Sequence, residues 1–206
     1  MVGASSVLLA SILTLLSPVL GAWTDDWAGI RAAANKVQSL QADFTQTKHL
    51  KILKHPIVSQ GKFYYRRPGQ IRWEYTSPVK SVVLLDGSGL RRYTWRGNRW
   101  VRDAGANLGP VQAVLREMDL WMRGDFASSK VFAPRLEPGS PAKIHLSPRD
   151  AALKKYVSGI DLVLSSTPGV VDSIEISEGP GASTRIDLQR VKLNQRIADK
   201  VFESVQ

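Results

Sequence analysis

Residues 61–78 read GKFYYRRPGQIRWEYTSP, two alternating segments separated by a Pro-Gly pair. A Pro-Gly pair is a strong turn signal. The segment is therefore expected to form a hairpin, with strands at residues 58–67 and 70–76 and a turn at residues 67–69.

One face of the second strand carries the large apolar side chains. Successive side chains of a strand point to opposite faces, so Ile71, Trp73 and Tyr75 share one face. Arg72 and Glu74 share the other face. Large apolar groups on one face of a curved sheet either fill a core or line a pocket for an apolar ligand. Patterning alone favours the core.

The same period of two continues on both sides of this hairpin. Further strands are expected at residues 42–47, 81–86, 90–95, 99–102, 130–136, 142–147, 154–165, 170–177 and 184–193. Helices are expected at residues 25–41, 110–123 and 197–202. Many antiparallel strands with few helices predict a mainly β fold. We expect an unclosed antiparallel barrel or strongly curved sheet, with helices covering its concave side.

Residues 1–22 are expected to form a signal peptide. The first 24 residues contain no charged side chain, and the apolar run at residues 7–16 is followed by a proline and small residues. This layout is typical of a secretory leader, although no basic residue follows Met1. The alternative is a buried or membrane-anchoring N-terminal helix. Cleavage near Ala22 would leave a single domain at residues 23–206.

The chain of 206 residues carries a net charge of +10. A basic excess favours a nucleic acid, an anionic membrane surface or an acidic partner. The basic residues are scattered, and an exported protein would not meet nucleic acid, so no nucleic-acid partner is expected. The sequence contains no cysteine, which excludes a disulfide scaffold, a Cys-ligated zinc and a thiol nucleophile.

The sequence lacks the motifs of common catalytic sites. It contains no HExxH metal pattern, no GxSxG nucleophile elbow and no Gly-rich phosphate loop. His49 and His55 fall in a basic loop expected at residues 48–56, and His145 alternates with apolar neighbours and should point off the buried face. We expect a protein that is not an enzyme, with no catalytic residue, metal site or cofactor.

A series of short motifs follows in order along the chain. ADFTQT at residues 42–47 comes after the first helix, and Arg67-Pro68 and RWEY at residues 72–75 come next. Asp86-Gly87 follows with Leu90 and Tyr93, and ADKVF stands at residues 198–202. In order and spacing, the chain resembles the periplasmic outer-membrane lipoprotein carrier family, the LolA type.

The resemblance implies an unclosed β-barrel whose hydrophobic cavity is covered by helices and takes lipoprotein acyl chains. In that family the Arg before Pro holds the lid through hydrogen bonds to loop backbone, and the matching residue here is Arg67. The aromatic before it corresponds to Tyr64, and the family's Trp corresponds to Trp73. The candidate ligand-binding residues are Arg67, Tyr64, Ile71, Trp73, Tyr75, Val114, Met118 and Trp121.

The resemblance also implies the partners of the protein. It implies a periplasmic monomer that accepts acylated cargo from an inner-membrane transporter and passes it to an outer-membrane acceptor. The contacts with both membrane proteins would be transient. Relatives of this carrier serve other export systems, so a glycolipid or fatty-acyl cargo is the alternative to a lipoprotein.

Overall fold

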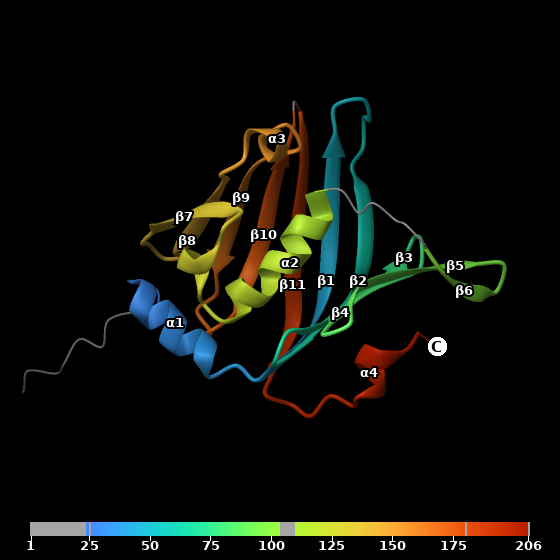
Figure 1. Ribbon diagram of the computed structural model, residues 1–206. Coiled ribbons are helices and arrows are strands. Elements are labelled where there is room, and N and C mark those ends of the chain that lie inside the picture. The colour runs from blue at the N-terminus through green and yellow to red at the C-terminus, as the bar shows by residue number, and fades with distance from the viewer. Residues whose placement is uncertain (1–23, 25, 104–109, 180, 206) are drawn as a thin grey trace, which may run out of the picture.

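Among the described residues, which are 24, 26–103, 110–179 and 181–205, eleven strands form one antiparallel sheet that curves around helix α2 (Figure 1). The expected signal peptide lies outside these residues. The strands are β1 (Ser39–Leu50), β2 (Ile57–Arg66), β3 (Gln70–Ser77), β4 (Ser81–Asp86), β5 (Gly89–Arg96), β6 (Arg99–Arg102), β7 (Phe132–Glu137), β8 (Lys143–Pro148), β9 (Val157–Leu164), β10 (Val171–Glu178) and β11 (Ala182–Leu193).

The order of strands across the sheet is β6-β5-β4-β3-β2-β1-β11-β10-β9-β8-β7. Two runs of hairpin-connected strands are therefore joined along β1 and β11, where Leu40 pairs with Leu193 and Leu50 pairs with Ala182. Strands β6 and β7 form the two free edges. The sheet is thus strongly curved and unclosed, which confirms the predicted fold class.

The helices are α1 (Trp27–Asn35), α2 (Pro110–Met122), the 3-10 turn η1 (Phe126–Ser128), α3 (Ala151–Lys154) and α4 (Lys200–Glu203). Helix α2 lies across the concave face of the sheet (Figure 1). Gly124 ends it with φ of 66°, and a side chain there would approach the Arg31 Cα of α1 to 2.8 Å. No helix in the described part of the chain is long and apolar enough to cross a membrane.

The prediction for the first helix was wrong at its C-terminal end. A helix was expected at residues 25–41, but α1 stops at Asn35 and β1 begins at Ser39. Leu40 fits a helical period, yet it pairs with Tyr65 on one side and Leu193 on the other. Pairing with two strands outweighs local helical pattern. The helix is capped by Asp26, whose side chain accepts a hydrogen bond from the Gly29 N–H at 2.6 Å.

Several other boundaries also differ from the prediction, among them the start of the last helix, expected at residue 197 and found at Lys200. Strand β1 continues to Leu50, so the basic loop is confined to residues 51–56. The strand expected from residue 154 begins at Val157, because α3 precedes it. Asp150 caps α3 by accepting hydrogen bonds from the backbone N–H groups of Ala152 and Leu153.

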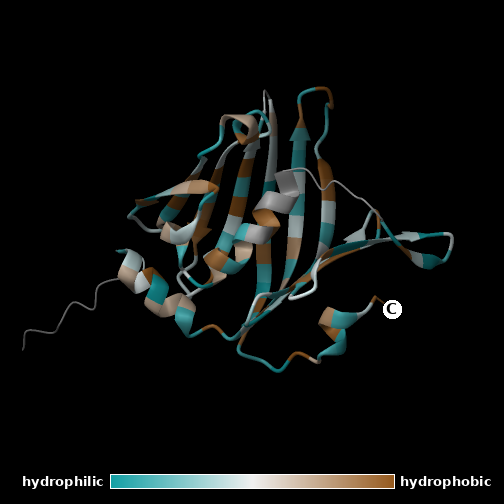
Figure 2. Ribbon diagram, in the orientation of Figure 1, coloured by the Kyte–Doolittle hydropathy of each residue, from teal (hydrophilic) through white to brown (hydrophobic). Residues whose placement is uncertain are grey.

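Figure 2 shows apolar and polar residues alternating along the strands, and the buried apolar residues form a core on the concave side of the sheet. The largest fully buried side chains include Phe44, Phe63, Tyr65, Ile144 and Leu146. His145, between the last two of these, points to the other face, as predicted, and its Nδ1 lies 2.7 Å from Asp161 Oδ1.

Candidate functional site

An aromatic cluster covers the concave face of the β1–β3 region. The Trp73 ring lies 4.8 Å from Phe44 and 5.4 Å from Phe63, and Tyr75 meets Phe44 edge-on at 5.3 Å. Gly61 makes room for this cluster, because a Cβ there would lie 2.5 Å from the Phe44 ring. Such tilted and edge-on pairs are favourable beyond their buried area. The cluster forms a stiff apolar floor.

Helix α2 forms the opposite wall. Its buried residues Val114, Met118 and Trp121 recur at steps of four and three, which places them on the face that looks at the sheet. Trp121 also meets Phe132 of β7 at 6.2 Å. The helix is therefore held against both halves of the sheet by apolar contacts.

Two pockets lie between α2 and the sheet. The larger encloses about 680 Å³ of space, some of it open to solvent, and the second about 540 Å³. Both are bordered by Trp73, Met118 and Ile174, so they are neighbouring parts of one apolar cavity.

One end of this cavity is polar. Lys48 Nζ lies 2.7 Å from Glu178 Oε2, and the Thr184 hydroxyl donates to Glu178 Oε1 at 2.5 Å. The Tyr75 hydroxyl donates to Gln46 Oε1 at 2.7 Å. All five side chains border the larger pocket. We call Gln46, Lys48, Glu178 and Thr184 the polar rim. The cavity is therefore amphipathic, with an apolar body and a charged end.

Two tyrosines on the concave face remain neutral hydrogen-bond donors over the whole physiological range. Burial raises the pKa of Tyr65 to about 12 and that of Tyr75 to about 12. The Tyr65 hydroxyl donates to Asp119 Oδ1 of α2 at 3.5 Å. Within the described residues, no group of three or more His, Cys, Asp or Glu side chains is placed to hold a metal ion.

A family model described as outer membrane lipoprotein carrier protein LolA matches residues 35–205. The chain belongs to this family. The match takes in every strand of the sheet and helix α2, and therefore both walls of the cavity.

Proteins named as outer-membrane lipoprotein carriers align with nearly the whole chain. An outer-membrane lipoprotein carrier protein of Alkalilimnicola ehrlichii is 29% identical over 202 residues, which cover 97% of this chain and 89% of that protein. One of Bordetella avium is 24% identical over 198 residues, with 96% and 91% covered. A solved DUF1329 family protein from Desulfovibrio piger superposes with a TM-score of 0.51 at 10% identity, over 90% of this chain and 97% of that one. That last likeness concerns the fold alone.

The structure places the eight candidate ligand-binding residues in four different settings, of which that of Arg67 is described below. Five of them border the cavity: Trp73, Tyr75, Val114, Met118 and Trp121. Ile71 is buried in the core and is not among the lining residues. Tyr64 lies on the other face of the sheet, where it borders a shallow pocket with Arg72 and Glu74. Binding roles for all of them stay predictions.

Sequence reasoning did not identify the polar rim or the isoleucines of β10 and β11. Alternation along the strands expected at residues 170–177 and 184–193 puts Ile174, Ile176 and Ile186 on one face. It did not show that this face looks at α2 across a cavity. Lys48 was assigned to a loop, because the pattern of β1 loses its apolar residues after Phe44. The rim depends on pairing between strands distant in sequence, which no local pattern reports.

Arg67 joins the β2–β3 turn to the end of α1. Its Nη2 donates to the Ala34 carbonyl at 3.1 Å and to Asn35 Oδ1 at 3.5 Å. The last carbonyls of a helix lack partners inside the helix and carry the negative end of its dipole, so a guanidinium suits this place. The Arg67 Nε is buried and has no hydrogen-bond partner among the described residues.

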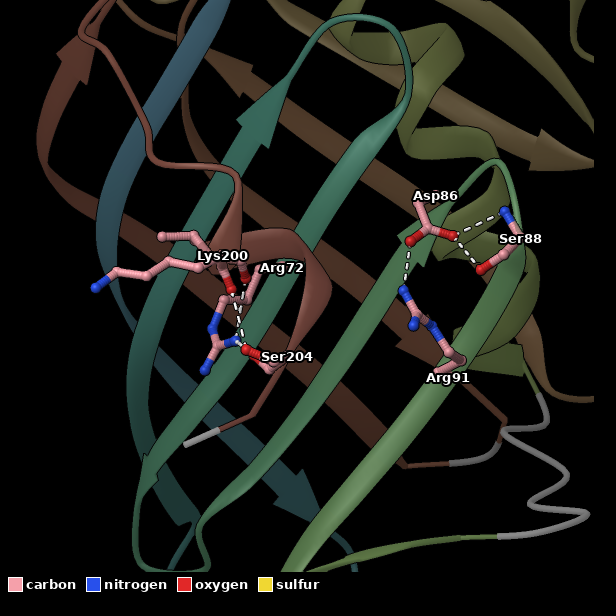
Figure 3. A network of polar contacts seen from close by, with 7 residues as sticks. Arg72, Asp86, Ser88, Arg91, Lys200 and Ser204 are labelled. Carbon is pink, nitrogen blue, oxygen red and sulfur yellow. Dashed lines mark hydrogen bonds and ion pairs between the residues drawn. The ribbon is translucent and has the colours of Figure 1, made fainter.

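The convex face holds the C-terminal segment. Arg72 Nη1 donates to the Val201 and Ser204 carbonyls at 3.1 and 2.9 Å, and Lys200 lies beside it (Figure 3). Phe202 of α4 is buried, with the Arg66 guanidinium 4.8 Å from its ring centre. These contacts fasten α4 to the outside of the sheet.

A second network in Figure 3 closes the β4–β5 turn. Asp86 accepts hydrogen bonds from the Ser88 N–H and hydroxyl and pairs with Arg91. The hydrogen bond from the Ser88 hydroxyl, then that from the Ser88 N–H and the Arg91 charge, lower the pKa of Asp86. This network shapes a hairpin and takes no part in the cavity.

Proposed function

We propose that this chain carries lipoproteins through the periplasm, holding their acyl chains between α2 and the concave face of the sheet. The observation that carries the proposal is the amphipathic cavity, apolar along Trp73, Met118 and Ile174 and charged at the Lys48–Glu178 end. Acyl chains fit the apolar body, and the linkage between lipid and peptide fits the polar rim. Family membership and the names of the relatives support the same role.

Transfer requires that binding is reversible. Each methylene moved out of water contributes about 0.8 kcal/mol, so several full acyl chains in a rigid open cavity would not be released. A lid whose displacement breaks its own contacts lowers net affinity. We assign this role to α1 and α2, which the Arg67 hydrogen bonds to α1 and the Tyr65–Asp119 contact hold in the closed state.

The proposed cycle has two partners. An inner-membrane transporter would load the cargo, and an outer-membrane acceptor would receive it. The carrier contributes binding and release but no chemical step. The predicted leader at residues 1–22 would deliver the chain to the compartment where this exchange takes place.

Mass spectrometry of ligand retained by natively purified protein tests the cargo class. We expect triacylated lipoprotein in the bound fraction. Recovery of only a glycolipid or a free fatty acid would instead assign the cavity to another lipid-export system and overturn the lipoprotein assignment.

A cavity-filling variant tests the binding site. Met118→Trp should lower affinity for an acylated peptide by roughly tenfold or more, because displacing even two methylenes costs about 1.6 kcal/mol. Val79→Trp is the matched control, since Val79 is 61% exposed on the β3–β4 turn. Affinity can be followed by displacement of a fluorescent fatty acid. Equal affinity of Met118→Trp and wild type would exclude this cavity as the binding site of the acyl chains.

A further inference from the structure

The tip of the β1–β2 hairpin combines apolar exposure with positive charge. Residues 48–58 read KHLKILKHPIV, with three lysines, two histidines and no acidic residue. Ile52 is 88% exposed, and Leu53, Ile57 and Val58 are also exposed. Single exposed apolar residues are common on protein surfaces, but four exposed apolar residues within seven positions form a patch.

Neighbouring segments extend this surface. A side chain at Gly181 of the β10–β11 turn would approach the Lys51 Cβ to 3.2 Å, and the Gly179 N–H donates to the Tyr156 carbonyl. Tyr156 is also exposed, and Lys154 and Lys155 precede it. The tip and α3 lie at the same end of the sheet (Figure 1). We call residues 51–58 together with residues 154–156 the basic tip.

Its cationic groups are free to meet an external partner. In the described ranges, no ion pair involves Lys51, Lys54, Lys154 or Lys155, whereas Lys48 is engaged by Glu178. Surface lysines beside exposed isoleucine and leucine are suited to a membrane interface, which has a layer of lipid phosphates above the start of the apolar acyl chains. The apolar side chains enter the headgroup region, while lysine amines stay with the lipid phosphates.

We propose that the basic tip docks on the surface of an anionic lipid bilayer. The binding would be shallow, because the backbone of residues 51–56 lies outside the strand ladder and cannot enter hydrocarbon without losing its water partners. Charge favours a bilayer over a protein groove, since four lysines that form no ion pair within the described residues suit a layer of lipid phosphates more than a protein surface of mixed charge.

Docking at this end would also orient the cavity. The polar rim includes Lys48, which is three residues from Lys51 along the hairpin. The charged end of the cavity would therefore face the bilayer. This proposal goes beyond cargo binding and does not depend on the identity of the cargo.

Site-specific fluorescence tests the proposal, because the chain has no cysteine of its own. Ile52→Cys, labelled with an environment-sensitive dye, should shift to the blue with phosphatidylcholine vesicles that contain phosphatidylglycerol. Lys36→Cys, labelled alike at the opposite end of the sheet, should not shift. Rising salt should weaken the binding. The proposal is overturned if the Ile52 label gives no shift, or gives the same shift with phosphatidylcholine alone.

Charge and apolar variants separate the two contributions. Lys51→Gln/Lys54→Gln should lower the affinity for vesicles, measured by co-sedimentation at low salt, roughly thirty-fold. Each lysine contributes about fivefold, and the two contributions multiply. Lys36→Gln/Lys192→Gln removes the same charge elsewhere and should retain most of the binding. Ile52→Ser/Leu53→Ser should lower binding roughly tenfold or more, while Ile52→Leu keeps it.

Equal losses in the two lysine pairs would overturn the proposal. So would binding only to vesicles that contain membrane proteins, which would assign the tip to a protein partner.

Fluorescent fatty-acid displacement should be unchanged in all these variants. The failure of the membrane proposal therefore leaves the proposed carrier function intact, and the reverse also holds.

Discussion

At position 61 only a hydrogen atom fits between two structural elements. A Cβ there would lie 2.0 Å from the Glu74 carbonyl oxygen and 2.5 Å from the Phe44 ring. Gly61→Ala should lower the free energy of unfolding by about 3 kcal/mol, because neither backbone nor a packed ring can move away cheaply. Urea denaturation followed by tryptophan fluorescence measures this loss. Gly87→Ala, which meets nothing within 4 Å, should change stability little.

In the proposed transfer cycle, Arg67 stabilises the closed state of the carrier through its hydrogen bonds to α1. Arg67→Leu removes its hydrogen bonds to Ala34 and Asn35, which are worth on the order of 1 kcal/mol each. The open, cargo-bound state should gain relative to the closed one. We expect normal loading but release slowed roughly tenfold, measured by transfer of labelled acylated peptide to acceptor vesicles.

Arg99→Leu is the control for this change, since Arg99 is exposed on edge strand β6. If Arg67→Leu releases the acylated peptide at the wild-type rate, Arg67 has no part in the proposed release step.

At the scale of elements, Arg72 supplies the side-chain hydrogen bonds to the backbone carbonyls of the α4 segment. Arg72 is buried and donates to the Val201 and Ser204 carbonyls, and Glu74 pairs with it at 2.9 Å. Arg72→Met should free α4, because each charge-assisted bond contributes about 1.5–3 kcal/mol. Limited proteolysis should then cut the C-terminal segment at least tenfold faster.

The matched control is Arg91→Met, which breaks the ion pair with Asp86 on another hairpin (Figure 3). It should leave cleavage near Lys200 unchanged. Equal rates in both variants would show that the remaining contacts, made by the buried Phe202 and by Arg66, hold α4 without Arg72.

The bounds of elements that are marked by local turn or helix signals could be predicted closely from the sequence. Strands β3 and β4 follow the expected bounds within one residue, because Pro68, Gly69 and Asp86 mark turns whichever partners the strands find. The expected helix at residues 110–123 is also confirmed, since its apolar period and its ending glycine agree. Helix α1 was extended too far, because Leu40 continues a helical period while belonging to a strand.

The candidate site was less accessible to sequence reasoning. Trp73 and Met118 were expected to face a ligand, and both border the cavity. The Lys48–Glu178 pair was not foreseen, because β1 and β10 are separated by β11 in the sheet and by most of the chain in sequence. Alternation tells which face a residue occupies. It does not tell what lies opposite that face.

At the scale of the whole molecule, buried tyrosines make stability depend on alkaline pH. The pKa of Tyr65 is raised to about 12 by burial, whereas the unfolded value is near 10. Below about pH 10 both states keep the proton and the stability is fully present. Between pH 10 and 12 the unfolded chain loses a proton that the folded chain retains, so stability falls by about 2 kcal/mol.

Urea denaturation at a series of pH values measures this loss. The slope of the unfolding free energy against pH should be shallower in Tyr65→Phe than in wild type. Tyr156→Phe, at an exposed position, should retain the wild-type slope. Equal slopes in all three proteins would mean that Tyr65 ionises alike in the folded and unfolded states.

The seam between β1 and β11 has a consequence for how the protein reaches its native state. The hairpins of β1–β6 and of β7–β11 form from contacts close in sequence, but Leu40 meets Leu193 only after a long loop closes. Long-range pairing of this kind slows folding. Until the seam closes, each half of the sheet presents its apolar face without a partner. Unpartnered apolar faces of this kind are prone to aggregation, so the rate at which the seam closes sets how long the folding chain is exposed to it.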